Sequence, residues 1–164
     1  MKKVLRGKYG WELWAKVYRR ELFDEPMYIP CHLRIGEDAT VYMQLVARSC
    51  KVKIINEALY NYIQYPSSAS HQRSVTLAEE TLQAAFYIDH LLKKESFYQE
   101  IRDEIDAMYL LFYSNSTRKA FLRLNHPLIY QVYQEHYSLR ALKILPLFKS
   151  IYISLSLLLR KTLS

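Results

Sequence analysis

The stretch Thr76–Phe112, TLAEETLQAAFYIDHLLKKESFYQEIRDEIDAMYLLF, decides the fold class of this chain. Its apolar residues recur at the three-, four- and seven-residue intervals that place side chains on one face of a helix. They are Ala78, Leu82, Ala85 and Leu92 in the first half, and Ile101, Ile105, Met108 and Phe112 in the second. The spacing predicts one helix that ends near Lys94 and a second over about 97–113 that can run on towards Leu124.

The flanks of this stretch supply start and stop signals. Thr76 and Glu79 have the spacing of a capping box, which would start the first helix. Pro127 cannot continue a helix, so a shorter helix is expected after it. A last helix over about 138–161 contains Pro146, which predicts a kink or a boundary there.

The first part of the chain is more mixed. Apolar residues at positions 11, 14, 18 and 22 predict a helix over roughly 10–22, and the Pro- and Gly-containing segment 24–36 predicts a loop. Asp38 is placed to N-cap a helix over about 39–50. Alternating residues over 51–56 and 59–65 predict two short neighbouring strands, and the small polar segment 66–74 predicts a loop. The expected class is α+β, predominantly helical.

Composition limits the chemistry. The chain has three glycines and neither a G-x-G-x-x-G nor a P-loop pattern, which argues against a complete nucleotide-binding domain of those types. Cys31 and Cys50 are far apart and the histidines do not cluster with them, so a structural zinc site is not expected. Reduced thiols and a cytoplasmic location are expected.

The net charge of +7 lies in the last third of the chain. Up to Asp106, 15 basic residues balance 15 acidic ones; from Ala107 onward eight basic residues face a single acid, Glu135. Such a segment favours anionic partners. Within the last expected helix, the longest uncharged run, 150–159, is too short to cross a bilayer, so residues 138–164 are expected either to lie on a membrane surface or to pack on the domain's own core.

Residues 10–75 resemble family-2 glycosyltransferases with the GT-A fold. The segment Trp14–Phe23, WAKVYRRELF, is similar to a W-x-K-L-Y/F-R-R-E-L-F pattern, and Gly36-Glu37-Asp38 matches a G-E-D pattern. The run 53–62, KIINEALYNY, matches K-I-x-x-I-x-E-x-L-Y-x-Y, and a small-residue segment at 67–71 closes the module. Four pieces occur in the family's order.

The resemblance implies an inverting transfer of a sugar from a nucleotide-sugar donor to a saccharide or lipid-linked acceptor, in cell-surface polysaccharide or glycolipid synthesis. It makes Asp38 the base that takes the proton of the acceptor hydroxyl, with Glu37 beside it to position the acceptor or tune the pair. Adjacent carboxylates raise one pKa, whereas a helix N-terminus favours the charged form, and the sequence leaves both effects open. From the residues alone, Asp38 can equally be a plain N-cap.

Other residues in the matching segments are candidates for substrate contacts. Trp14 can stack on an acceptor sugar or pack in the core. Lys16 and Arg19 can meet a diphosphate or an anionic acceptor, or simply be solvated. Tyr60 and its neighbour Tyr62 face one side of the expected strand, at the floor of the cleft. His71 lies where some GT-A enzymes have a metal-ligating histidine, although a histidine in a polar loop is commonly just solvated.

The resemblance also implies a part that is missing. Family members bind the sugar nucleotide on an N-terminal βαβ region ending in a D-x-D motif, which holds Mg or Mn. The sequence contains no D-x-D. Residues 1–75 are therefore expected to be the acceptor side of an incomplete catalytic domain, and residues 76–164 a helical C-terminal region. The chain, whether a fragment of a longer protein or a truncated product, is expected to be inactive alone.

Two other functional classes remain open. A non-catalytic basic helical module could bind a membrane surface or nucleic acid, and a non-catalytic interaction protein could derive from the enzyme family. The chain has no recognised nucleic-acid motif and its basic residues are spread over three expected helices, which argues against nucleic acid. The expected location is cytoplasmic, with peripheral contact to the inner face of the plasma membrane through 138–164.

Overall fold

The helices of the molecule surround a central pair, α3 and α4. A computed structural model of the chain describes residues 1–65, 68 and 71–162. In order, the helical elements are α1 (Lys2–Leu5), the 3-10 turn η1 (Arg20–Phe23), α2 (Glu37–Arg48), α3 (Val75–Leu92), the 3-10 turn η3 (Tyr98–Ile101), α4 (Arg102–Ser116), α5 (Pro127–His136), α6 (Leu139–Ile144) and α7 (Leu147–Thr162). The prediction of a predominantly helical chain is confirmed.

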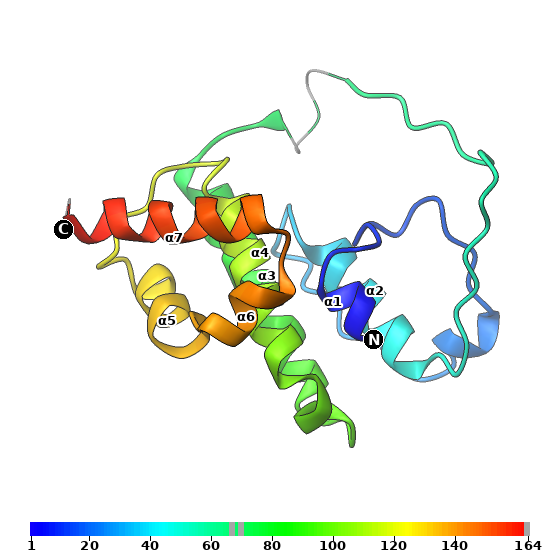
Figure 1. Cartoon of the computed structure of the whole chain (residues 1–164). Coiled ribbons are helices and arrows are strands. Elements are labelled where there is room, and N and C mark those ends of the chain that lie inside the picture. The colour runs from blue at the N-terminus through cyan, green and yellow to red at the C-terminus, as the bar shows by residue number, and fades with distance from the viewer. Residues whose placement is uncertain (66–67, 69–70, 163–164) are drawn as a thin grey trace.

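Helix α4 forms the centre of the core. Its side chains from Ala107 to Tyr113 are all buried, because neighbours cover it on several sides. Helix α3 packs along it, α2 packs on α3, and α1, α5, α6 and α7 contact α4 from other directions. Figure 1 shows this arrangement, with the chain's N-terminus beside α2 and its C-terminus at the far end of α7.

The helix ends follow local capping chemistry, with one correction. Helix α3 begins at Val75, and its N-cap is Ser74, whose hydroxyl accepts a hydrogen bond from the Leu77 N–H at 3.1 Å. The predicted capping box was therefore wrong: Thr76 lies inside the first turn, and Glu79 contacts His126 at 3.0 Å. Serine at the N-cap satisfies a backbone donor that the helix itself cannot.

The prolines mark boundaries as predicted, whereas the extension of the second helix does not occur. Helix α4 ends at Ser116 and does not run on to Leu124. Pro127 is the first residue of α5, where its missing N–H costs nothing. Pro146 separates α6 from α7, so the expected last helix is two helices.

The predicted helix over 10–22 was wrong. Residues 12–15 form bends and a turn, residues 16–19 have no regular secondary structure, and Arg20–Phe23 makes a single 3-10 turn. Ala15 has a φ of 56°, which a right-handed helix does not accommodate. Long-range contacts outweigh the local helical pattern here: the Trp11 indole stacks on Phe112, with ring centroids 4.6 Å apart, and donates to the Val4 carbonyl at 2.8 Å.

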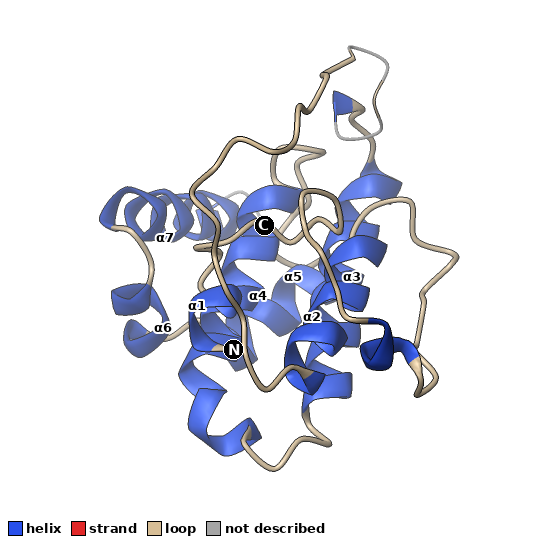
Figure 2. Cartoon of the chain, turned by 90° about the vertical axis from the view of Figure 1, so that its right-hand side faces the viewer, coloured by secondary structure: helices blue, strands red, loops and turns tan. Residues whose placement is uncertain are grey.

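The predicted strands over 51–65 were also wrong. These residues form an extended, exposed loop, and the described part of the chain contains no strand (Figure 2). The loop leaves the helical body after α2 and returns at α3 (Figure 1). A lone extended segment has no partner for its backbone N–H and C=O groups and cannot form a sheet. Part of the predicted loop over 66–74, including Ser67 and Ser70, lies outside the described residues.

None of the helices in the described ranges is both long enough and apolar enough to cross a bilayer.

Candidate functional site

The candidate site centres on the start of α2, where Gly36, Glu37 and Asp38 follow one another. The N-cap is Gly36, so the prediction that Asp38 caps this helix was wrong; Asp38 is its second residue. Gly36 has a φ of 98°, and a Cβ there would lie 2.4 Å from the Ala84 Cβ on α3. Only glycine satisfies both the left-handed backbone and this close approach.

Asp38 contacts the chain next to the segment 14–23, which belongs to the same family resemblance. Its Oδ2 atom lies 3.5 Å from the backbone N of Leu13, and Tyr18 lies close enough for its ionisation to sense the charge. Burial, together with nearby Tyr42, Asp38 and Glu12, raises the pKa of Tyr18 to about 12. Asp38 thus lies close to Leu13 and Tyr18, in a segment that does not form the predicted helix.

The surroundings of Glu37 show whether its pKa is raised or lowered, which the sequence left open. Burial is the main cause that raises the pKa of its carboxyl, and the charges of Asp38 and Glu80 add to it. The backbone N–H groups of Glu37 and Asp38 oppose this rise and are outweighed. Its Oε2 atom is buried and has no hydrogen-bond partner among the described residues. Burial therefore outweighs the helix N-terminus at Glu37, and the pKa of its carboxyl lies above that of an exposed glutamate.

The side chains of Trp14, Tyr60 and Tyr62 form an exposed aromatic platform, and Trp14 directly follows Leu13, whose backbone N approaches Asp38. The Trp14 indole stacks on the Tyr62 ring, at 4.5 Å and 5° between planes, and on the Tyr60 ring, at 5.3 Å and 18°. Trp14 remains 38% exposed, Tyr60 50% and Tyr62 45%. Trp14 is thus not a core tryptophan, and the two tyrosines do share one side of the chain, as their spacing predicted.

The two basic candidates differ in their surroundings. The Lys16 ammonium donates to the Glu12 carbonyl at 2.6 Å, pairs with the Glu12 carboxylate at 3.3 Å, and lies 4.8 Å from the centre of the Tyr42 ring. Its charge is therefore engaged within the protein, beside α2. Arg19 is exposed and precedes η1.

His71 is exposed and lies in the segment before α3. Within the described ranges, no three His, Cys, Asp or Glu side chains gather closely enough to hold a metal ion.

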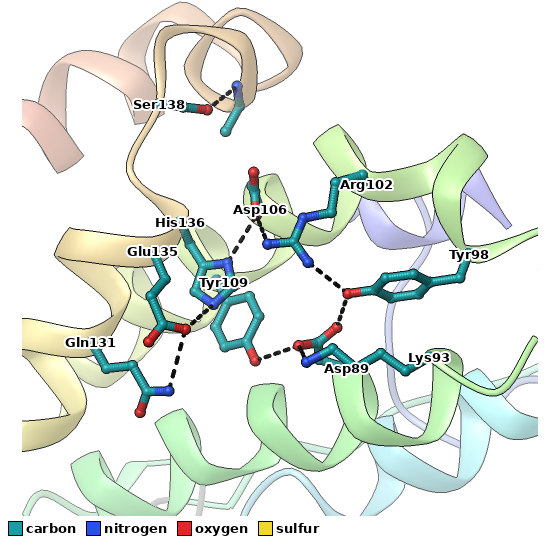
Figure 3. A network of polar contacts seen from close by, with 11 residues as sticks. Asp89, Lys93, Tyr98, Arg102, Asp106, Tyr109, Gln131, Glu135, His136 and Ser138 are labelled. Carbon is teal, nitrogen blue, oxygen red and sulfur yellow. Dashed lines mark hydrogen bonds and ion pairs between the residues drawn. The ribbon is translucent and has the colours of Figure 1, made fainter.

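The sequence did not predict a second polar cluster, which lies inside the helical region (Figure 3). Asp89, 3% exposed, accepts hydrogen bonds from the Tyr98 hydroxyl at 2.6 Å and the Tyr109 hydroxyl at 3.1 Å, and pairs with Lys93 at 3.0 Å. The Arg102 guanidinium donates to the Tyr98 hydroxyl at 2.8 Å. This network joins α3, η3 and α4.

A buried histidine extends the cluster to α5. His136, 2% exposed, contacts the Asp106 carboxylate through Nδ1 at 2.8 Å and stacks on the Tyr109 ring at 3.5 Å. Every group here is satisfied by a partner in the protein, so the cluster fixes helix positions rather than offering a reactive group to solvent. No short motif signals it, because the partners come from four separate elements.

The raised pKa of a tyrosine in this cluster predicts that the folded state loses stability at alkaline pH. Burial, and then Asp89, raises the pKa of Tyr98 from 10.0 to about 12. A raised tyrosine pKa stabilises the fold fully below the unfolded value, and that stabilisation is lost as pH rises from about 10 through about 12. We expect the urea midpoint of unfolding to fall over this interval, and to fall less in Tyr98→Phe. Tyr130→Phe, at an exposed site, should behave as the unmodified chain does; an equal fall in all three proteins would contradict the assignment.

Comparisons with protein-family models, with curated proteins and with solved structures found no match.

Proposed function

We propose that residues 10–65 form the acceptor side of an inverting glycosyltransferase, which binds a saccharide on the Trp14, Tyr60 and Tyr62 platform beside Asp38. The observation that carries this proposal is the exposed aromatic stack on Trp14, the residue after Leu13, whose backbone N approaches the Asp38 carboxylate. Flat aromatic faces suit the apolar face of a pyranose ring, and adjacent carboxylates accept hydrogen bonds from its hydroxyls. The resemblance of this region to family-2 enzymes supports the same reading.

In the proposed reaction, Asp38 is the base. The acceptor hydroxyl gives its proton to the Asp38 carboxylate while its oxygen bonds to the anomeric carbon of the donor sugar, and the bond from that carbon to the diphosphate breaks. Asp38 suits this role because it lies in the first turn of α2 and approaches the segment that carries Trp14. Glu37 precedes it in that turn and suits the role of a neighbour that positions the acceptor.

The donor side of the proposed enzyme belongs to another segment. The nucleotide sugar, and the Mg or Mn that would neutralise its diphosphate, require a carboxylate set that the described residues do not assemble. The exposed loop 51–65 supports the proposal that the donor is bound by another segment. It presents Val52, Ile54, Leu59 and Ile63 at 55% exposure or more, as expected of a segment that packs against further structure.

The saccharide-binding step tests the proposal without a donor half. In a Trp11→Phe background, Trp14 is the single indole, and soluble oligosaccharides of glucose, galactose and N-acetylglucosamine are titrated while its fluorescence is followed. We expect at least one series to bind. Trp14→Ala, followed by saturation-transfer NMR, should weaken that binding at least about tenfold, equivalent to ~1.4 kcal/mol.

A matched control distinguishes saccharide binding at this platform from non-specific binding to exposed aromatic rings. Tyr130→Ala removes an aromatic ring of similar exposure from α5, far along the chain, and should leave binding unchanged. Asp38→Asn keeps an acceptor oxygen and should also retain the saccharide while lacking the base. Binding that survives Trp14→Ala, or no binding in any series, would refute the proposed site.

A further inference from the structure

Helix α7 has two apolar faces, and only one of them is covered. Ile153, Ser156, Leu157 and Arg160 are buried against the bundle. The large apolar side chains that point outward, each at least 45% exposed, are Leu147, Phe148, Ile151, Tyr152, Leu155, Leu158 and Leu159. At about 100° per residue, these outward residues occupy one continuous arc of roughly 140° that contains no charged residue. Such a face is larger than scattered surface apolar residues would produce.

The orientation of α7 is fixed from its inner side. The buried Arg160 side chain donates to the Leu122 carbonyl at 2.8 Å and to the Ser156 carbonyl at 3.1 Å, and its guanidinium lies 4.4 Å from the centre of the Phe121 ring. The Tyr113 hydroxyl on α4 also bonds the Ser156 hydroxyl at 2.8 Å. Rotating the helix to hide its outer face would break these buried contacts, so the outer face stays outward. Figure 2 shows α7 at one edge of the bundle.

The charges around this face are of one sign. Lys149 and Lys161 lie on opposite sides of the apolar arc, and the sequence after Glu135 contains no acidic residue. Beside the start of α7, Ser114, Arg118, Phe148, Lys149 and Tyr152 line an open groove of about 280 Å³. Two cations thus border an apolar surface, with the Tyr152 hydroxyl held by the Thr117 hydroxyl at 2.7 Å.

We propose that the outer face of α7 is a membrane-docking surface that lies in the plane of an anionic bilayer, with Arg118 and Lys149 contacting lipid phosphates at the groove. An apolar arc bordered by basic residues has the form of an interfacial helix. A second copy of the chain fits less well, because the same cations would face one another around the contact. The proposal uses a surface separate from the saccharide platform and stands without the proposed enzymatic function.

Vesicle binding by the whole chain tests the docking surface. We expect co-sedimentation with vesicles of equal parts phosphatidylglycerol and phosphatidylcholine, at least about tenfold weaker binding to phosphatidylcholine alone, and weakening by salt. Ile151→Ser/Leu155→Ser/Leu158→Ser should lower the partition coefficient for anionic vesicles by more than about tenfold, since each change removes apolar groups that would be buried in the bilayer on docking. Arg118→Glu/Lys149→Glu should abolish the preference for anionic lipid.

Two matched variants control for exposed apolar area and for net charge. Ile54→Ser/Leu59→Ser/Ile63→Ser changes three equally exposed residues in the 51–65 loop, and Lys51→Glu/Lys94→Glu makes the same charge change elsewhere; both should bind as the unmodified chain does. Absence of vesicle binding, equal binding to both lipid mixtures, or equal loss in the control variants would overturn the proposal. The proposal would also be overturned if light scattering showed the unmodified chain to be a dimer and the α7 triple variant to be a monomer that still binds vesicles.

Discussion

Asp89→Ala is expected to lower the free energy of unfolding by about 2–6 kcal/mol, because two buried tyrosine hydroxyls lose their acceptor. The substitution removes the acceptor of two tyrosine hydroxyls, at 2.6 and 3.1 Å, and the partner of Lys93 at 3.0 Å. The Tyr98 and Tyr109 hydroxyls would then be buried without Asp89 as an acceptor, and each such loss costs ~1–3 kcal/mol. Urea denaturation followed by circular dichroism measures the change.

Two further variants show whether the carboxylate is the cause. Asp89→Asn keeps an acceptor oxygen but loses the charge, so its loss should be smaller than that of alanine. Asp24→Ala, at an exposed carboxylate, should stay within about 0.5 kcal/mol of the unmodified chain. A loss below about 1 kcal/mol for Asp89→Ala would mean that α3, η3 and α4 are held together by apolar packing alone.

The helical half of the fold could be predicted because its local and long-range signals agree. Leu82, Ala85 and Ile105 recur at helical spacing, and all are fully buried between α3 and α4. Pro127 and Pro146 are read correctly as boundaries, since their effect on the backbone is local. The end of α4 at Ser116 lies close to the predicted 113, and the extension towards Leu124 stayed open because the residues after Ser116 carry no strong stop signal.

The first half could not be predicted from periodicity, because distant contacts decide its conformation. The helical spacing of Trp11 and Trp14 is real, but Trp11 is held by Phe112, about a hundred positions away, and Ala15 adopts a left-handed backbone. The alternation over 51–65 predicts a strand only if a neighbouring strand exists to pair with it, and the described residues supply none.

The candidate site could be predicted only in part, because some of its features depend on residues that are distant in sequence. The segment 13–16 contacts Asp38 through Leu13, the Tyr42 ring of α2 through Lys16, and Tyr60 through Trp14. The burial that raises the pKa of Glu37 comes from the folded chain, so no sequence pattern could show it. The choice of Gly36 as N-cap likewise depends on α3, whose Ala84 approaches it.

Gly36→Ala is therefore expected to be the most damaging small substitution at the candidate site. The new Cβ would meet the Ala84 Cβ at 2.4 Å, and alanine would have to hold a φ of 98°. A strained φ costs about 1–3 kcal/mol and overpacking a similar amount, so the free energy of unfolding should fall by roughly 2–5 kcal/mol. Saccharide binding should weaken as well, because Gly36 also accepts the first-turn bonds from the Thr40 N–H at 3.0 Å and hydroxyl at 2.9 Å that set the start of α2.

A second substitution separates the two causes. Ala84→Gly removes the atom that the new Cβ would strike, at its own cost of ~1 kcal/mol for glycine inside a helix. In the double variant the clash disappears while the backbone strain remains, so stability should recover in part relative to Gly36→Ala, with a favourable coupling of at least about 1 kcal/mol. Zero coupling would show that the left-handed backbone alone demands glycine. A Gly36→Ala protein as stable as the unmodified chain would show that α2 can begin without this close approach to α3.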